Sequence, residues 1–160
     1  MSRVLPSAKD VRDLLEDLLG RNITVSSADR LLSTDLYNTM VSLYVDDTLR
    51  LSAVVGLDLH LTVFSAAALG LVPPGGAKAV IEDREISPLL AENAGEVCNI
   101  LGSLLNREGL PHIRFYQKFL PGEPAPTDAT GYLMALGRRL DLAVDVAGYG
   151  SGKLSIALAN

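Results

Sequence analysis

Glu96 and Asn99 stand three residues apart in a stretch whose polar and apolar residues recur with the period of an α-helix. At this spacing a carboxylate and a carboxamide share one helix face, and the carboxamide both donates and accepts hydrogen bonds. The residues that repeat along this face are Glu92, Glu96, Asn99, Ser103 and Asn106. The pair could hold a water molecule or bind a polar group of a partner.

The opposite face of the same stretch is apolar. It carries Leu90, Ala94, Val97, Leu101 and Leu104, about 200° away from the polar residues. Ser87 is a suitable N-cap, and Pro88 suits the first helical position, where its missing N–H costs nothing. Arg107 and Gly109 are typical of a helix C-terminus. The sequence therefore predicts an amphipathic helix over residues 88–107, with Glu96 and Asn99 on its outer face.

Gly95 and Gly102 flank the polar face. A glycine inside a helix costs about 1 kcal/mol relative to alanine, so each needs a structural or functional reason. One reason is close packing against a neighbouring element. Another is that the backbone of a partner approaches Glu96 and Asn99. A polar helix face is also often only the solvated side of the helix, and periodicity alone leaves all three readings open.

The segment from Glu92 to Gly102 resembles the active-site helix of the CheX/CheC/FliY family of chemotaxis phosphatases. That family carries an acidic residue or Ser, a Glu four residues later, and an Asn three residues after the Glu. Glu92, Glu96 and Asn99 match this pattern, and Pro121 stands where the family has a downstream proline. Glu92 departs from the usual Asp or Ser. Chain length and element order are similar to those of the single-site CheX type.

The resemblance implies an α+β fold with long helices packed on a mainly antiparallel sheet. It implies dephosphorylation of the acyl phosphate on the receiver domain of a CheY-like response regulator. Asn99 would position the attacking water, and Glu96 would dock against a lysine of the receiver. Glu92, Gly95, Gly102 and Ser103 would contact this partner. The chain would need no cofactor of its own, since the receiver supplies a divalent metal (Mg), and it would form a homodimer.

Alone, a Glu–Asn pair makes a poor hydrolase, because it offers no activated nucleophile, metal set or oxyanion loop. It suffices when the substrate is already an activated acyl phosphate, since phosphoryl transfer then mainly needs a water held in line. The alternative is an adaptor domain that binds a receiver with little or no turnover.

Composition limits the class of protein. A chain of 160 residues with 48% hydrophobic and 21% charged residues predicts one globular domain over residues 1–160. Its net charge of −5, without a basic cluster, argues against nucleic-acid binding. No apolar run is long enough to predict a membrane helix. Cys98 is the only cysteine, which excludes an internal disulfide and favours a cytoplasmic setting.

Hydrophobic patterning predicts the remaining elements. A first helix is expected over residues 7–19, with Ser7 and Asp10 as a capping box and Gly20 at its end. A short helix is expected over 65–71, followed by a loop over 73–86 that begins with two prolines and two glycines. Strands are expected over 39–44, 48–55, 57–63, 113–119, 132–136, 139–146 and 153–158.

Three other features resemble functional sites but do not indicate one. His60 has no second His or Cys at ligand spacing, so no metal site is expected there. Cys98 borders the apolar stripe and is expected to be a buried small hydrophobe. The glycines between Gly148 and Lys153 fail the phosphate-loop pattern, because Ala147 stands where that pattern begins and a strand pattern follows. They predict a hairpin turn.

Overall fold

The computed structural model describes residues 3–159. Its framework is a six-stranded sheet in the order β1-β5-β6-β3-β2-β4, and every neighbouring pair is antiparallel. The strands are β1 (Ile23–Ser27), β2 (Thr39–Val45), β3 (Leu51–Asp58), β4 (Arg114–Phe119), β5 (Arg139–Val146) and β6 (Gly150–Leu158). The chain thus has the α+β fold and the antiparallel sheet that were expected.

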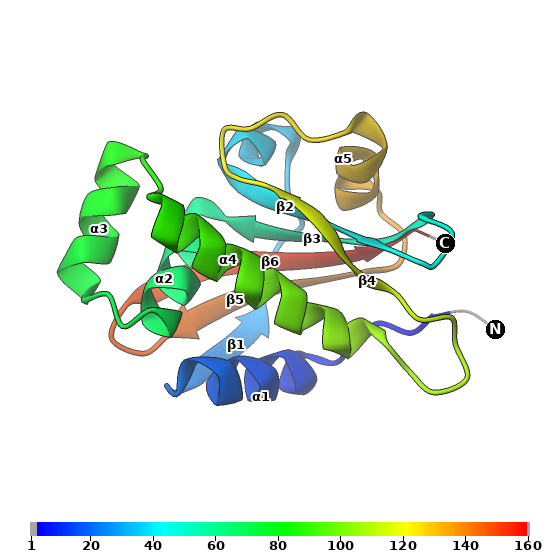
Figure 1. Ribbon diagram of the computed structural model, residues 1–160, viewed down its shortest axis with the longest axis horizontal. Coiled ribbons are helices and arrows are strands. Elements are labelled where there is room, and N and C mark those ends of the chain that lie inside the picture. Colours follow the sequence, from blue (N-terminus) through cyan, green and yellow to red (C-terminus); the bar gives the residue numbers. More distant parts are fainter. Residues whose placement is uncertain (1–2, 160) are drawn as a thin grey trace.

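Three helices cover one face of the sheet: α1 (Ala8–Leu19), α2 (Leu59–Leu69) and α4 (Pro88–Leu101) (Figure 1). α3 (Pro74–Asp83) packs against the outside of α2 through the buried Ala77. Aliphatic side chains from these helices and from the inner face of the sheet form the main core. α2 contacts both α4 and β6, and α4 also contacts β4, so α4 rests on α2 and on the sheet.

The other face of the sheet is covered only in part. α5 (Thr127–Met134) packs there against β2, β3 and β6, beside the short 3₁₀ helix η1 (Ser33–Asn38). A second, smaller core lies beneath them and includes Leu31, Val54 and Leu133. Arg139 closes the end of α5: its guanidinium donates to the carbonyls of Leu133 and Ala135, and it pairs with Asp141 at 2.8 Å.

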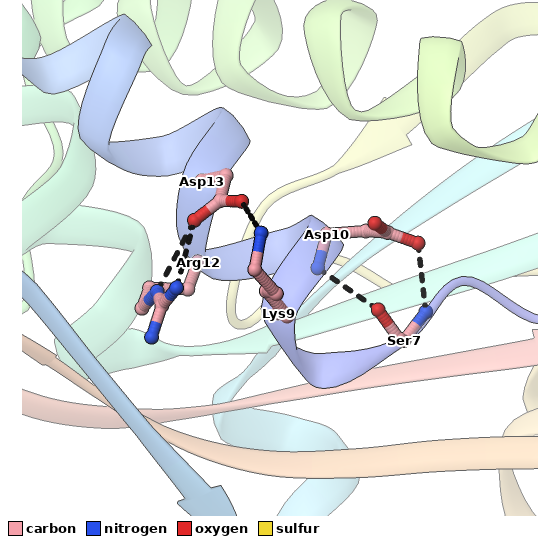
Figure 2. A network of polar contacts seen from close by, with 5 residues as sticks. All are labelled: Ser7, Lys9, Asp10, Arg12 and Asp13. Atoms are coloured by element: carbon pink, nitrogen blue, oxygen red, sulfur yellow. Dashed lines mark hydrogen bonds and ion pairs between the residues drawn. The ribbon is translucent and has the colours of Figure 1, made fainter.

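The predicted first helix is confirmed as α1. Ser7 Oγ accepts from the backbone N–H of Asp10 at 3.0 Å, and the Asp10 carboxylate accepts from the Ser7 N–H at 3.1 Å (Figure 2). This is the expected capping box, which satisfies two N–H groups that the helix leaves free. Gly20 ends the helix with φ of 65°, in the left-handed region that glycine adopts without strain.

Arg3 fastens the segment before α1 to a distant loop. Its guanidinium is largely buried and donates to the carbonyl of Leu105 and, at 2.6 Å, to the carbonyl of Pro111. These two carbonyls lie on either side of the turn that joins α4 to β4. Residues 3–6 therefore form a strap across that turn, which we call the N-terminal strap.

The strand expected over 57–63 is wrong beyond Asp58, because α2 begins there. Asp58 is its N-cap and accepts from the N–H of Leu61 at 2.8 Å. α2 is buried on nearly all sides, so it has no polar face to reveal a helical period. The leucines that alternate through Leu57, Leu59 and Leu61 therefore imitate a strand. The short helix expected over 65–71 is the second half of α2, which ends at Leu69.

Two further expectations are wrong. The loop predicted over 73–86 contains α3, because Pro74 takes the first helical position instead of ending a helix. The strand predicted over 132–136 lies at the end of α5, a helix of eight residues too short to show a clear period. The strands expected near β2, β4, β5 and β6 are confirmed, as is the turn after β5. β3 begins three residues later than predicted, since Asp46 holds residues 46–50 in a turn.

Within residues 3–159, no helix is both long enough and apolar enough to span a bilayer.

Candidate functional site

The phase of α4 is as predicted. Ser87 Oγ accepts from the N–H of Leu90 at 3.2 Å, and Pro88 occupies the first turn. The buried residues of the helix are Leu90, Ala94, Val97, Cys98 and Leu101, and each is at most 3% exposed. Burying this face on α2 and the sheet holds the opposite face outward.

Glu92, Glu96 and Asn99 are exposed on that outer face. Within residues 3–159, none of their side chains makes a hydrogen bond or an ion pair, so their polar groups are free to contact a partner. Ser103 is exposed beside them, but its hydroxyl donates to the carbonyl of Ile100 at 2.8 Å. The structure thus brings the predicted Glu–Asn pair together with Glu92 and Ser103 on one open surface, which we call the α4 face.

Asn93 fixes α4 to α2. Its side-chain amide donates to the carbonyl of Ala66 at 3.2 Å, close to the end of α2. Gly70 makes this possible, since a Cβ at that position would lie 2.4 Å from the Asn93 amide nitrogen. The α4 face is therefore held in place by a polar contact as well as by apolar packing.

Cys98 lies beneath the α4 face, fully buried and between two side chains of β2. Ser42 Oγ donates to its sulfur at 2.9 Å, and the Tyr44 hydroxyl donates to its backbone carbonyl. Burial raises the pKa of the Cys98 thiol to about 11, although the Ser42 hydrogen bond and the charge of Lys118 act in the opposite direction. The thiol therefore stays protonated, and Cys98 is the buried hydrophobe that was expected.

α4 is shorter than predicted. It ends at Leu101 and continues as a 3₁₀ helix, η2 (Gly102–Leu105), in place of an α-helix to residue 107. Asn106 does not extend the polar face. Its side chain donates to the carbonyls of Gly102 and Ile113 and accepts from the N–H of Ile113 at 2.9 Å. Asn106 therefore closes the turn toward β4.

Both glycines have packing neighbours. A Cβ at Gly102 would lie 3.2 Å from the ring of Tyr44, and Gly102 is buried. A Cβ at Gly95 would lie 3.2 Å from the ammonium nitrogen of Lys118 and 3.5 Å from its Cδ and Cε. Close packing, one of the explanations left open by the sequence, accounts for Gly102. Gly95 remains partly exposed at the margin of the α4 face.

Lys118 also reaches this surface at Gly95, although no pattern in the sequence indicates it. It lies on β4, which runs beside α4 (Figure 1), and pairs with Ser42 of β2. Only the pairing of strands far apart in the sequence brings it to α4. Pro121 follows β4 and, with Ile86 and Tyr37, lines a depression of about 60 Å³ near the start of α4.

None of the pockets described within residues 3–159 is lined by the exposed side chains of the α4 face. Larger pockets of about 480 and 210 Å³ are lined by residues outside α4, near Arg21 and near Arg84 respectively. Within residues 3–159, no group of three or more His, Cys, Asp or Glu side chains is arranged to hold a metal ion. The geometry suits contact with another macromolecule rather than enclosure of a small ligand.

No family model matches the sequence, and no curated protein matches it. Among solved structures, the chain is similar to FliY of Thermotoga maritima, with a TM-score of 0.56 and 15% identity over 91% of this chain and 80% of that one. It is similar to FliM in the FliG–FliM complex of H. pylori, with a TM-score of 0.55 and 14% identity over 94% and 85%. It is also similar to the chemotaxis protein CheX of Desulfovibrio desulfuricans, with a TM-score of 0.51 and 9% identity over 94% of each chain. The chain therefore has the fold shared by CheX, FliY and the FliM middle domain.

Proposed function

We propose that this protein hydrolyses the acyl phosphate of a CheY-like receiver domain. The observation that carries the proposal is the α4 face, where Glu96 and Asn99 are exposed and without a partner in residues 3–159. Both side chains are therefore available to a docked protein. The likeness in fold to CheX of D. desulfuricans supports this reading.

In the proposed reaction Asn99 holds the attacking water through one atom of its carboxamide. The water oxygen forms a bond to phosphorus while the bond from phosphorus to the receiver's carboxylate oxygen breaks. The carboxylate leaves as the anion, and the proton of the water passes to the phosphate product or to solvent. Positioning of this kind supplies much of the rate enhancement in phosphoryl transfer. The receiver supplies its own divalent metal, so the proposed reaction needs no metal ligand from this chain.

Glu96 has a docking role in this proposal, as the ion-pair partner of a lysine on the receiver. Glu92, Gly95 and Ser103 border the pair and are proposed contacts of the same partner. Gly102, which the sequence grouped with them, lies buried against Tyr44, and a Cβ there would crowd the ring. We place this activity in the cytoplasm, in keeping with a chain that has one cysteine and no disulfide.

The proposal is tested by phosphate release from a panel of acyl-phosphorylated receivers. Asn99→Ala should lower turnover about 100-fold or more, because the water loses its support. Folding stability should stay unchanged or rise slightly, since alanine is the better helix former at an exposed position.

Glu96→Ala should instead weaken receiver binding, and this loss of affinity should shrink as salt is added. Glu85→Ala, at an exposed site before α4, is the control. Full phosphate release by Asn99→Ala would refute the phosphatase assignment.

An adaptor domain that binds a receiver without turnover is the second candidate. It is favoured by the likeness to FliM, which was solved in a complex with FliG, a protein–protein assembly. Wild-type protein that binds a receiver but releases no phosphate across the panel would select this function.

A further inference from the structure

The side chain of Lys118 is directed at α4 by the pairing of β4 with β2. Its strand neighbour Ser42 hydrogen-bonds to Cys98 of α4, so both residues project from the face of the sheet that α4 covers. The stem of Lys118 then crosses the helix surface at Gly95, where a Cβ would lie 3.2 Å from the ammonium nitrogen. Gly95 thus leaves room for a lysine to reach the α4 face from a different element.

The ammonium group of Lys118 lies at Gly95, on the margin of the α4 face and about one helical turn from both Glu92 and Asn99. Gly95 precedes Asn99 by four residues and follows Glu92 by three, and such positions are neighbours on a helix, about 5–6 Å apart at Cβ. Lys118 is partly buried, yet within residues 3–159 it makes no hydrogen bond or ion pair. Its charge acts on the nearby Cys98 thiol, whose pKa is raised chiefly by burial. Within residues 3–159, the structure therefore holds an unpaired cation at Gly95, one helical turn from Asn99.

A cation at this place resolves an electrostatic conflict. The exposed residues of the α4 face include two carboxylates, Glu92 and Glu96, but no basic side chain from α4 itself. A phosphoryl group brought to Asn99 is anionic, and both carboxylates would repel it. An ammonium group fixed one helical turn from Asn99 offsets this repulsion and attracts the phosphoryl oxygens.

We propose that Lys118 completes the site by placing its ammonium group against the phosphoryl oxygens of the docked receiver, beside the water held by Asn99. This inference rests on the proposed function. Lys118 forms no covalent bond and transfers no proton in this role. It makes the α4 face prefer a phosphorylated receiver over an unphosphorylated one, a preference that the two carboxylates alone would oppose.

Two measurements test this role. The first is kcat/KM for phosphate release, and the second is the ratio of affinities for a receiver with and without bound beryllofluoride, a stable mimic of the phosphoryl group. Lys118→Met keeps the apolar stem and removes the charge, so it should lower kcat/KM at least tenfold and bring the affinity ratio close to one. Lys118→Arg keeps the positive charge, so it should retain most of the wild-type kcat/KM and most of the affinity ratio. Lys78→Met removes an exposed charge from α3 and should change neither.

Gly95→Ala provides an independent arm, because its methyl group must displace the end of Lys118. It should lower the affinity ratio while the protein stays folded. A Lys118→Met variant with wild-type kcat/KM and an unchanged affinity ratio would overturn the inference while the phosphatase function stands. If the wild-type protein binds the beryllofluoride-loaded receiver without releasing phosphate, the phosphatase function fails and the affinity ratio still tests Lys118. If the wild-type protein neither releases phosphate nor binds any beryllofluoride-loaded receiver more tightly than the unloaded one, both proposals fail.

Discussion

At the scale of single residues, the Cys98 cluster shows how the chain supports an exposed site with buried polar groups. Ser42 and Tyr44 both donate to Cys98, one to its sulfur and the other to its carbonyl. All three side chains are fully buried. These bonds tie α4 to β2 at Cys98, the residue before Asn99, so the backbone that carries the exposed carboxamide is firmly held.

The thiol of Cys98 predicts a dependence of stability on alkaline pH. An unfolded thiol ionises near its ordinary pKa of 9.0, whereas the buried thiol stays neutral up to about pH 11. Between these values the unfolded state releases a proton that the folded state keeps. The free energy of unfolding should therefore fall as pH rises, by up to about 1.4 kcal/mol per pH unit from this group.

Urea unfolding of the wild type and of Cys98→Ala across this pH range checks the prediction. Cys98→Ala should be less stable below pH 9, and its deficit should shrink toward pH 11, because it lacks the thiol. Groups that do not interact with Cys98 titrate in both proteins and cancel in the difference. Tyr44 does not cancel fully, because its pKa is raised chiefly by burial and also by the charge of Cys98. A deficit that stays constant with pH would contradict the prediction.

At the scale of elements, the two glycines of α4 and η2 should respond in opposite ways to the same substitution. Gly95→Ala should raise the free energy of unfolding by up to about 1 kcal/mol, because alanine favours the helix and only the flexible end of Lys118 must move. Gly102→Ala should lower it by about 1–3 kcal/mol, since the new methyl group meets the buried ring of Tyr44.

Denaturant unfolding of both variants measures whether each substitution raises or lowers the free energy of unfolding. Gly131→Ala is a suitable control within a helix, because nothing lies within 4 Å of a Cβ at that position. Stabilisation by Gly102→Ala would mean that Tyr44 is not rigidly held.

Helices with one solvent-exposed face could be predicted from the sequence, whereas buried helices and short helices could not. α1 and α4 show both a capping residue and a helical period, so their starts and faces were predicted correctly. α2 shows no period because it is covered on nearly all sides, and only Asp58 marks its start. For α3, the pattern of two prolines and two glycines suggested a break, although Pro74 fits the first turn of a helix.

The candidate site divides in the same way. Glu92, Glu96 and Asn99 come from one helix, so local periodicity places them together. Lys118 reaches them through the β2–β4 pairing, whose partners Ser42 and Lys118 are far apart in the sequence. No local sequence pattern predicts that Lys118 contacts α4. Only the glycine at position 95 indicates that some group packs closely there.

At the scale of the whole molecule, the sheet ends in two edge strands, β1 and β4. Edge strands expose unpaired backbone groups that proteins often cover by association. The homodimer expected from the sequence remains a prediction, with pairing of these edges as its mechanism. Equilibrium sedimentation at micromolar concentration should give twice the 17.0 kDa mass of the chain. A monomer at that concentration would contradict it.

The N-terminal strap has a consequence for the order of folding. Arg3 and Leu105 are 102 positions apart, so their hydrogen bond closes one of the longest loops in the chain. Closing such a loop early has a large entropic cost, which falls once the elements between its ends have formed. We therefore expect the strap to dock after α4 and the turn that follows it have formed. Docking of the strap would then fix the final form of this turn, and with it the approach of Lys118 to the site.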